Sequence, residues 1–267
     1  MNGVRVPLPG SRHRHAAVQA SMELFMTVKD ASLAPMIAVI GCDGSGKSTV
    51  SEQIVVWASD YGPAATAHLG KQAGNVGRKL TSLPLVGKFI GRFIGHKNFS
   101  LREPRAKNKT PGILAALVAS IFTLRRVLRF RRMLGLRRKG FIVITDRFPQ
   151  LEYPNSFDGP VLSEAAEGSF FVRWLARHEW AAFEWMTSYR PDLVIRLNID
   201  LDTACARKPD HVRRKLQRKI EITPLLKYNG APIVEIDSTQ PLEQVLAEAR
   251  EAVTRFLTEH GCTRLKS

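Results

Sequence analysis

Nine residues between an apolar stretch and a helical stretch constrain this chain more than any other feature. They read Gly41-Cys-Asp-Gly-Ser-Gly-Lys-Ser-Thr49 and match the pattern G-x-x-x-x-G-K-[S/T]. Residues 36–40 before them are uniformly apolar, as in a buried strand, and residues 47–59 predict a helix. Such a turn points successive backbone N–H groups at one anion, next to the positive end of a helix dipole. The sequence therefore predicts a strand, a phosphate-binding loop and a helix.

The residues of this loop have distinct predicted roles in holding a nucleoside triphosphate. Lys47 would reach the β- and γ-phosphates, and the hydroxyl of Ser48 would be a ligand of Mg²⁺, the expected cofactor. A chance match to this pattern occurs about once in a hundred chains of this length, before the flanking strand and helix are counted. The predicted ATP-binding residues of the loop are Gly41, Asp43, Gly44, Ser45, Gly46, Lys47, Ser48 and Thr49.

Short apolar runs alternate with longer helical stretches along the rest of the chain, which is the order of a parallel sheet with crossover helices. This predicts the α/β class and a P-loop NTPase fold, with a five-stranded parallel sheet flanked by helices. Helices are expected over residues 47–59, 111–138, 163–189 and 242–257. The predicted strands are residues 36–40, 64–69, 141–145, 192–198 and 232–237.

The length of 267 residues and the 44% apolar content suit one catalytic domain with appendages. We expect a flexible basic arm over residues 1–35, although an amphipathic targeting peptide stays open there. The P-loop domain is predicted over residues 36–267. Within it, residues 70–139 read as a basic insertion with a helical second half on the acceptor side, and residues 207–219 as a basic lid.

The formal charge of +16 indicates polyanionic partners, such as nucleotides, nucleic acid or an acidic membrane surface. Three cysteines without metal-binding spacing fit a reducing cytoplasm. The longest apolar run, residues 113–124, covers roughly 18 Å as a helix and is too short for a bilayer core of about 30 Å.

Two further groups of residues fit the same phosphate chemistry. Asp146 and Arg147 close the third predicted strand, where an acid can hold Mg²⁺ and an arginine can grip a phosphate, although a structural ion pair at the strand end stays open. Seven cations within residues 207–219 suit a lid that closes on transferring phosphates, unless they form a solvated helix face.

Some side chains have a weaker predicted role. Asp158, in an Asp-Gly-Pro turn, could orient an acceptor hydroxyl. Four aromatic residues at helical spacing could stack on a base, but this spacing favours the core: Trp174, Trp180, Phe183 and Trp185.

With these elements in order, the chain resembles the thymidylate kinase-like group of nucleoside-monophosphate kinases. The resemblance covers about 220 residues from Met36 onward. The matching segments are residues 41–49, Asp146-Arg147-Phe148, and residues 191–200, 234–237 and 241–245.

This resemblance implies an ATP:nucleoside-monophosphate phosphotransferase, with Asp43 near the sugar of the acceptor and Arg147 at its phosphate. It also implies that the turn with Ser238 and Thr239 lies beside the adenine of ATP. Some members carry an arginine where this chain has Gly44, so the catalytic cation is expected from the lid, from Arg213 or Arg214.

The chain departs from the resemblance after Phe148. Residues 149–160 lack the segment with which thymidylate kinases hold thymine, and residues 70–138 are unusually basic. The acceptor, dTMP or a related monophosphate, therefore stays open.

Two rival functions also stay open. The chain could be a P-loop ATPase that binds nucleic acid through residues 125–139, or a kinase that lies on an anionic membrane through residues 113–124 and the adjacent arginines. A homodimer is possible, since related kinases are often dimers.

Overall fold

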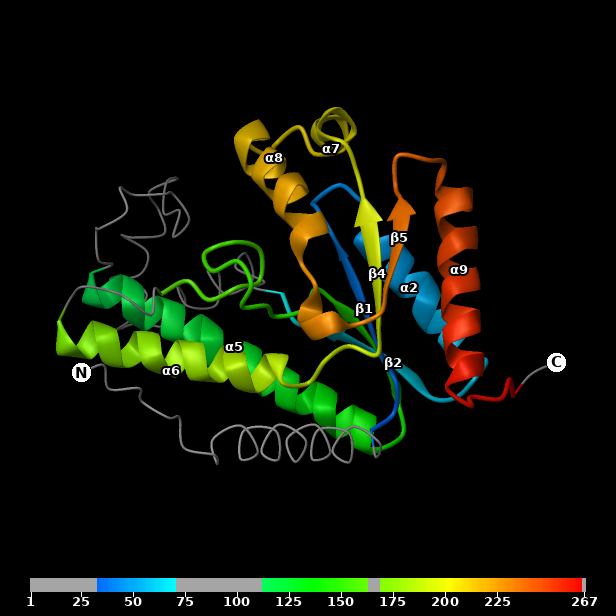
Figure 1. The fold of residues 1–267 in the computed structure, drawn as a ribbon, viewed down its shortest axis with the longest axis horizontal. Helices are drawn as coiled ribbons and strands as arrows, with labels where there is room; N and C mark the ends of the chain where they lie inside the picture. The colour runs from blue at the N-terminus through cyan, green and yellow to red at the C-terminus, as the bar shows by residue number, and fades with distance from the viewer. Residues whose placement is uncertain (1–32, 71–111, 163–168, 266–267) are drawn as a thin grey trace, which may run out of the picture.

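The computed structural model describes residues 33–70, 112–162 and 169–265 (Figure 1). Residues 1–32 of the predicted arm and residues 71–111 of the predicted insertion lie outside this part of the chain. Both features therefore stay predictions, apart from the helix that forms the second half of the insertion.

Five parallel strands in the described residues form a sheet, which confirms the predicted α/β class. They are β1 (Met36–Gly41), β2 (Ala64–His68), β3 (Ile142–Asp146), β4 (Leu193–Asn198) and β5 (Ile233–Asp237). Their order across the sheet is β2-β3-β1-β4-β5. The three central strands are apolar along most of their length because helices cover both of their faces.

Two pairs of helices cover the two faces of the sheet (Figure 1). Successive residues of a strand point to opposite faces, so Ile37 and Ala38 of β1 enter different layers. The pair on the Ile37 face is α2 (Lys47–Ala58) and α9 (Leu242–Glu259), and the pair on the Ala38 face is α5 (Ile113–Arg138) and α6 (Phe170–Thr187).

α5 and α6 lie side by side with their N-terminal ends together (Figure 1). The buried carboxylate of Glu179 joins them, because it accepts hydrogen bonds from the Thr123 hydroxyl (2.8 Å) and from Leu162 N (2.6 Å). α6 begins later than the predicted residue 163, after Ser169, whose hydroxyl caps its first turn, while residues 163–168 are outside the described part. The prediction that its aromatic residues form the core is correct for Phe183 and wrong for Trp174, which is exposed.

The predicted lid spans the end of α7 (Leu201–Arg207), a loop and much of α8 (Arg213–Ile222). Two 3₁₀ turns, Thr223–Leu225 and Tyr228–Gly230, then lead into β5. Arg196 of β4 anchors the first turn, since its buried guanidinium donates to the carbonyls of Pro224 (3.0 Å) and Leu226. Movement of α8 as a lid stays a prediction.

The strand order predicts a ligand site at the carboxyl ends of β1 and β3. The connection after β1 runs to β2 at one edge of the sheet, whereas the connection after β3 runs past β1 to β4. Ligands of open parallel sheets bind at the carboxyl ends of the strands where the connections diverge in this way. The loop after β1 holds residues 41–49, and the loop after β3 begins with Arg147.

Candidate functional site

The loop between β1 and α2 has the backbone that its glycines predict. Gly44 and Gly46 have φ angles of 93° and 82°, which side chains rarely allow. A Cβ at Gly41 would lie 2.5 Å from Ser45 Oγ and 2.7 Å from Leu197 O, so no larger residue fits there. The loop therefore curls tightly against the ends of β1 and β4.

Lys47 lies inside this loop, at the first position of α2. Its side chain is 8% exposed, and Nζ donates to Cys42 O at 2.6 Å. Burial, with a contribution from the nearby charge of Arg147, lowers the pKa of Lys47 to about 8. Ser48 and Thr49 follow it and are exposed. The ammonium thus bonds to a carbonyl of its own loop, a contact that a phosphate oxygen could replace.

Asp146 ends β3 beside the loop, since its Cα pairs with that of Val39 in β1. Its Oδ2 lies 3.8 Å from His68 Nδ1. Its buried Oδ1 has no hydrogen-bond partner among the described residues. An oxygen without a donor suits a cation, and Mg²⁺ prefers hard oxygen ligands with several waters and phosphates. Asp146 and the exposed hydroxyl of Ser48 therefore fit the predicted Mg²⁺, although no cluster of three metal-binding side chains occurs in the described ranges.

Arg147 follows Asp146 with a φ of 71°, a conformation uncommon for a side-chain-bearing residue. Its guanidinium lies 3.1 Å from Asp43 Oδ1 and 3.7 Å from Asp158 Oδ2. The charge of Asp158 raises the pKa of Arg147, against the opposing effect of burial, and Asp43 adds to the rise. The strained backbone places this cation directly beside the phosphate-binding loop.

Asp43 receives a second cation from α8, because Lys219 Nζ bonds to Asp43 Oδ2. Burial alone would raise the pKa of Asp43, but the charges of Lys219 and Arg147 hold it well below its usual range. Asp43 is therefore ionised and links the loop, β3 and α8.

Asp158 lies behind Arg147 and is 4% exposed. Arg126 of α5 donates to its carboxylate (2.7 Å) and to its backbone carbonyl (2.6 Å). The structure thus brings Asp158 to the site, in contact with two guanidinium groups. Its contact with an acceptor stays a prediction.

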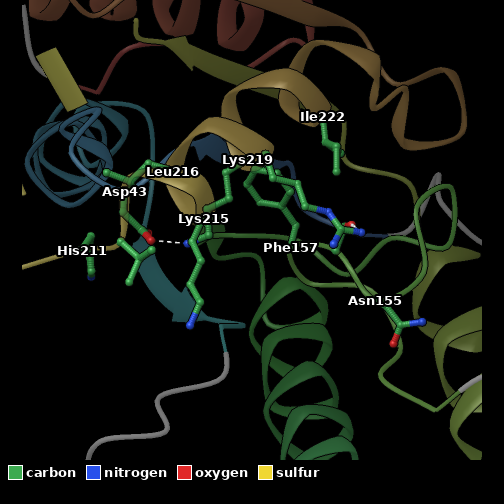
Figure 2. Close-up of a pocket in the computed structure, with 11 residues that line it drawn as sticks. Asp43, Asn155, Phe157, His211, Lys215, Leu216, Lys219 and Ile222 are labelled. Carbon is green, nitrogen blue, oxygen red and sulfur yellow. Dashed lines mark hydrogen bonds and ion pairs between the residues drawn. The ribbon is translucent and has the colours of Figure 1, made fainter. Parts of the chain in front are cut away.

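A cavity of about 250 Å³ opens beside Asp43, between the loop at residues 155–157 and α8 (Figure 2). Asp43 points toward Lys219 at its edge (Figure 2). Its lining combines cations with apolar surface: Asp43, Asn155, Ser156, Phe157, His211, Val212, Lys215, Leu216, Arg218, Lys219 and Ile222.

The predicted lid cations that lie on α8 divide into two groups. Lys215, Arg218 and Lys219 line the cavity. Arg213 instead pairs with Asp202 at 2.8 Å on an exposed side, and Arg214 is exposed. The roles of Arg213 and Arg214 stay predictions that require a movement of α8. Helical spacing of residues 215, 219 and 222 is the signal that could have singled out the inward side of α8.

Ser238 lies at the same edge of the sheet, after β5. Its hydroxyl donates to Asn198 O at 2.5 Å. Arg207 bridges this turn to the phosphate-binding loop, because one nitrogen donates to Ser238 O (2.9 Å) and Gly44 O (3.3 Å). The sequence placed Arg207 only among the lid cations and missed this bridging contact.

Comparison with known proteins places the chain in a family. No protein-family model matches it. It is 38% identical over 234 residues to the uncharacterized ATP-binding protein YghS of Escherichia coli strain K12. The aligned region covers 87% of this chain and 98% of YghS. It is 40% identical over 221 residues to the uncharacterized ATP-binding protein YghR of the same strain. This aligned region covers 82% of this chain and 86% of YghR. Such identity over nearly the full length shows that the chain belongs to the family of YghS and YghR.

Proposed function

We propose that this protein is an ATP-dependent phosphotransferase that moves the γ-phosphoryl group of Mg·ATP to a nucleoside monophosphate or a related phosphorylated acceptor. The observation that carries the proposal is the position of Asp43. Asp43 belongs to the same loop as Lys47, and its carboxylate contacts Arg147 and Lys219. It also lines the cationic cavity beside α8. The predicted phosphate-binding loop and a cavity lined by cations therefore share one wall.

ATP as the donor is supported by the loop and by the names of YghS and YghR as ATP-binding proteins. The backbone N–H groups of residues 41–49 would bind the phosphates, and Lys47 would exchange Cys42 O for a phosphate oxygen. Ser48 and Asp146 would hold Mg²⁺, which neutralises phosphate charge when bound. Ser238, bridged to Gly44 by Arg207, would lie toward the adenine.

The acceptor would occupy the cavity beside Asp43. Arg147 would bind its phosphate, with Asp158 and Asp43 holding the guanidinium in place. In the transfer, an acceptor oxygen forms a bond to the γ-phosphorus while the bond from that phosphorus to the bridging oxygen breaks, and ADP leaves. The lid cations, with Arg213 and Arg214 as candidates after a movement of α8, would stabilise the charge on the transferring oxygens.

The test is ADP release by the purified full chain with Mg·ATP and a panel of nucleoside monophosphates and nucleosides. We expect turnover with a monophosphate, its loss in Lys47→Ala, and its retention in Lys139→Ala, an exposed lysine after α5. If ATP binds but no acceptor on the panel is phosphorylated, the nucleotide-kinase assignment is wrong and only the ATP site stands.

A further inference from the structure

The solvent side of α5 carries an apolar stripe that the site does not use. Its members are exposed and recur every three or four residues, so they share one face of the helix. Leu124, in the middle, is 59% exposed. The stripe is Ile113, Leu117, Ile121, Leu124 and Leu128.

The same side of α5 turns basic after the stripe. Exposed cations follow at Arg131, Arg132, Arg138 and Lys139. Arg131 lies over the Trp185 ring, 5.7 Å from its centroid. No acidic residue occurs between residues 113 and 139. An apolar stripe and a cationic end therefore lie along one helix without any negative side chain.

The start of α6 adds aromatic residues at the apolar end of α5. Ala116 and Ala119 of α5 pack against Val172 and Ala176, so the first turns of the two helices lie together. Phe170 is 71% exposed, and the exposed rings of Phe171 and Trp174 stack with centroids 6.0 Å apart. Both helices extend beyond the sheet at this end (Figure 1).

We propose that this surface, the exposed side of α5 with the first turns of α6, docks on an anionic lipid bilayer. Leucine, isoleucine and aromatic side chains flanked by arginines suit a helix that lies in the plane of a membrane interface. The cations complement the negative surface of such a bilayer. No helix in the described ranges is long and apolar enough to cross a membrane.

Two other occupants fit the surface less well. Nucleic acid would use the arginines but would leave the exposed leucines and isoleucines without an apolar partner. A second copy of the chain would carry the same charge of +16, and its α5 would bring arginines without a matching acid on that helix. An anionic bilayer matches both the apolar and the cationic parts.

This proposal does not depend on the phosphotransferase. None of the residues of the docking surface lines the cavity beside Asp43. Loss of membrane binding and loss of turnover can therefore be measured separately, on the same protein.

The test is co-sedimentation of the full chain with vesicles of phosphatidylcholine alone and of phosphatidylcholine mixed with phosphatidylglycerol. We expect binding to the mixed vesicles that weakens as salt rises. The double variant Leu124→Gln, Leu128→Gln and the double variant Arg132→Gln, Arg138→Gln should each lower the partition coefficient at least about tenfold. The matched control is Val56→Gln, Leu242→Gln, which changes two equally exposed apolar residues on the helices of the other sheet face and should bind normally.

Several outcomes would overturn the proposal. One is that the protein does not bind the mixed vesicles. Another is that all variants bind these vesicles equally well while their melting temperatures are unchanged. Tight binding to duplex DNA that needs Arg132 and Arg138 but not the leucines would assign the surface to nucleic acid. A dimer in light scattering that the leucine variant converts to a monomer would assign it to a second copy.

Discussion

At the residue scale, the ionisation of Lys47 should control how ATP binds. The pKa of this lysine is lowered to about 8, chiefly by burial and also by Arg147. ATP phosphates would interact with the ammonium form and would raise this pKa on binding. Above the pKa of the ATP-free protein, binding must therefore be accompanied by uptake of a proton.

The sign of the resulting pH dependence follows from this uptake. The dissociation constant of Mg·ATP should be nearly constant below about pH 8. Above this pH it should rise by up to about tenfold per pH unit, because binding then requires a proton. Titration calorimetry across this range measures it. Lys47→Ala should bind Mg·ATP more weakly, and its dissociation constant should not change with pH in this way. An equal pH dependence in both proteins would refute the assignment to Lys47.

The buried ion pair between Arg126 and Asp158 has a structural consequence that is independent of catalysis. The two side chains are 2% and 5% exposed. If one is removed, the charge of the other stays buried without this partner. We expect Arg126→Ala to lower the free energy of unfolding by about 3 kcal/mol. Arg132→Ala, on the exposed side of the same helix, should change it by less than about 0.5 kcal/mol. Chemical denaturation of both variants would decide, and equal losses would contradict this account.

At the element scale, α8 presents one side to the cavity and another to solvent. Lys219 contacts Asp43 on the inner side, whereas Gln217 is exposed and bonds to Glu221. The charge run of residues 207–219 predicted a basic element, but cations on a helix share a function only where they share a face. The run alone therefore could not identify Lys219.

Removal of Lys219 tests the function of this inner side. Under the proposed phosphotransferase function, Lys219→Ala should lower kcat/KM for Mg·ATP and the acceptor on the order of 10–100-fold, because the cavity would lose a cation that could stabilise the transferring phosphoryl group. Gln217→Ala should retain turnover. Arg213→Ala and Arg214→Ala test the roles predicted from the sequence, since a loss of kcat in either would require α8 to move during the reaction. Full activity of Lys219→Ala would exclude Lys219 from catalysis.

At the scale of the whole molecule, the site connects both layers of the protein. The loop enters α2 on one face of the sheet, and Arg147 contacts Asp158, which Arg126 holds on the α5 face. A ligand that bridges these parts should stabilise the complete domain and not only a loop.

Ligand binding should therefore raise the global stability. Mg·ATP at a hundred times its dissociation constant should increase the free energy of unfolding by about 2.7 kcal/mol. Thermal unfolding with and without ligand measures this, and chelation of Mg²⁺ should remove much of the gain. Lys47→Ala should show a smaller increase, and a full increase in this variant would place ATP elsewhere.

The sequence by itself determined the features of this protein that depend on residues close together in the chain. The glycines at 41, 44 and 46 predict the tight turn, and the short apolar runs predict all five strands, because backbone freedom and the length of an apolar run can be read from neighbouring residues. The position of Asp146 at the edge of the sheet was predicted because this residue ends an apolar strand. Helix starts were less certain, as for α6, where the cap at Ser169 decided the boundary.

Only the tertiary structure decided which distant side chains meet. The order of the strands places Asp146 beside the loop, the direction of α8 brings Lys219 to Asp43, and Arg126 reaches Asp158 from α5. It also left the apolar side of α5 exposed, although its isoleucines and leucines recur at the spacing of a core-facing side. These contacts join residues far apart in the chain, and their geometry follows from the packing of helices on both faces of the sheet, which no local pattern contains.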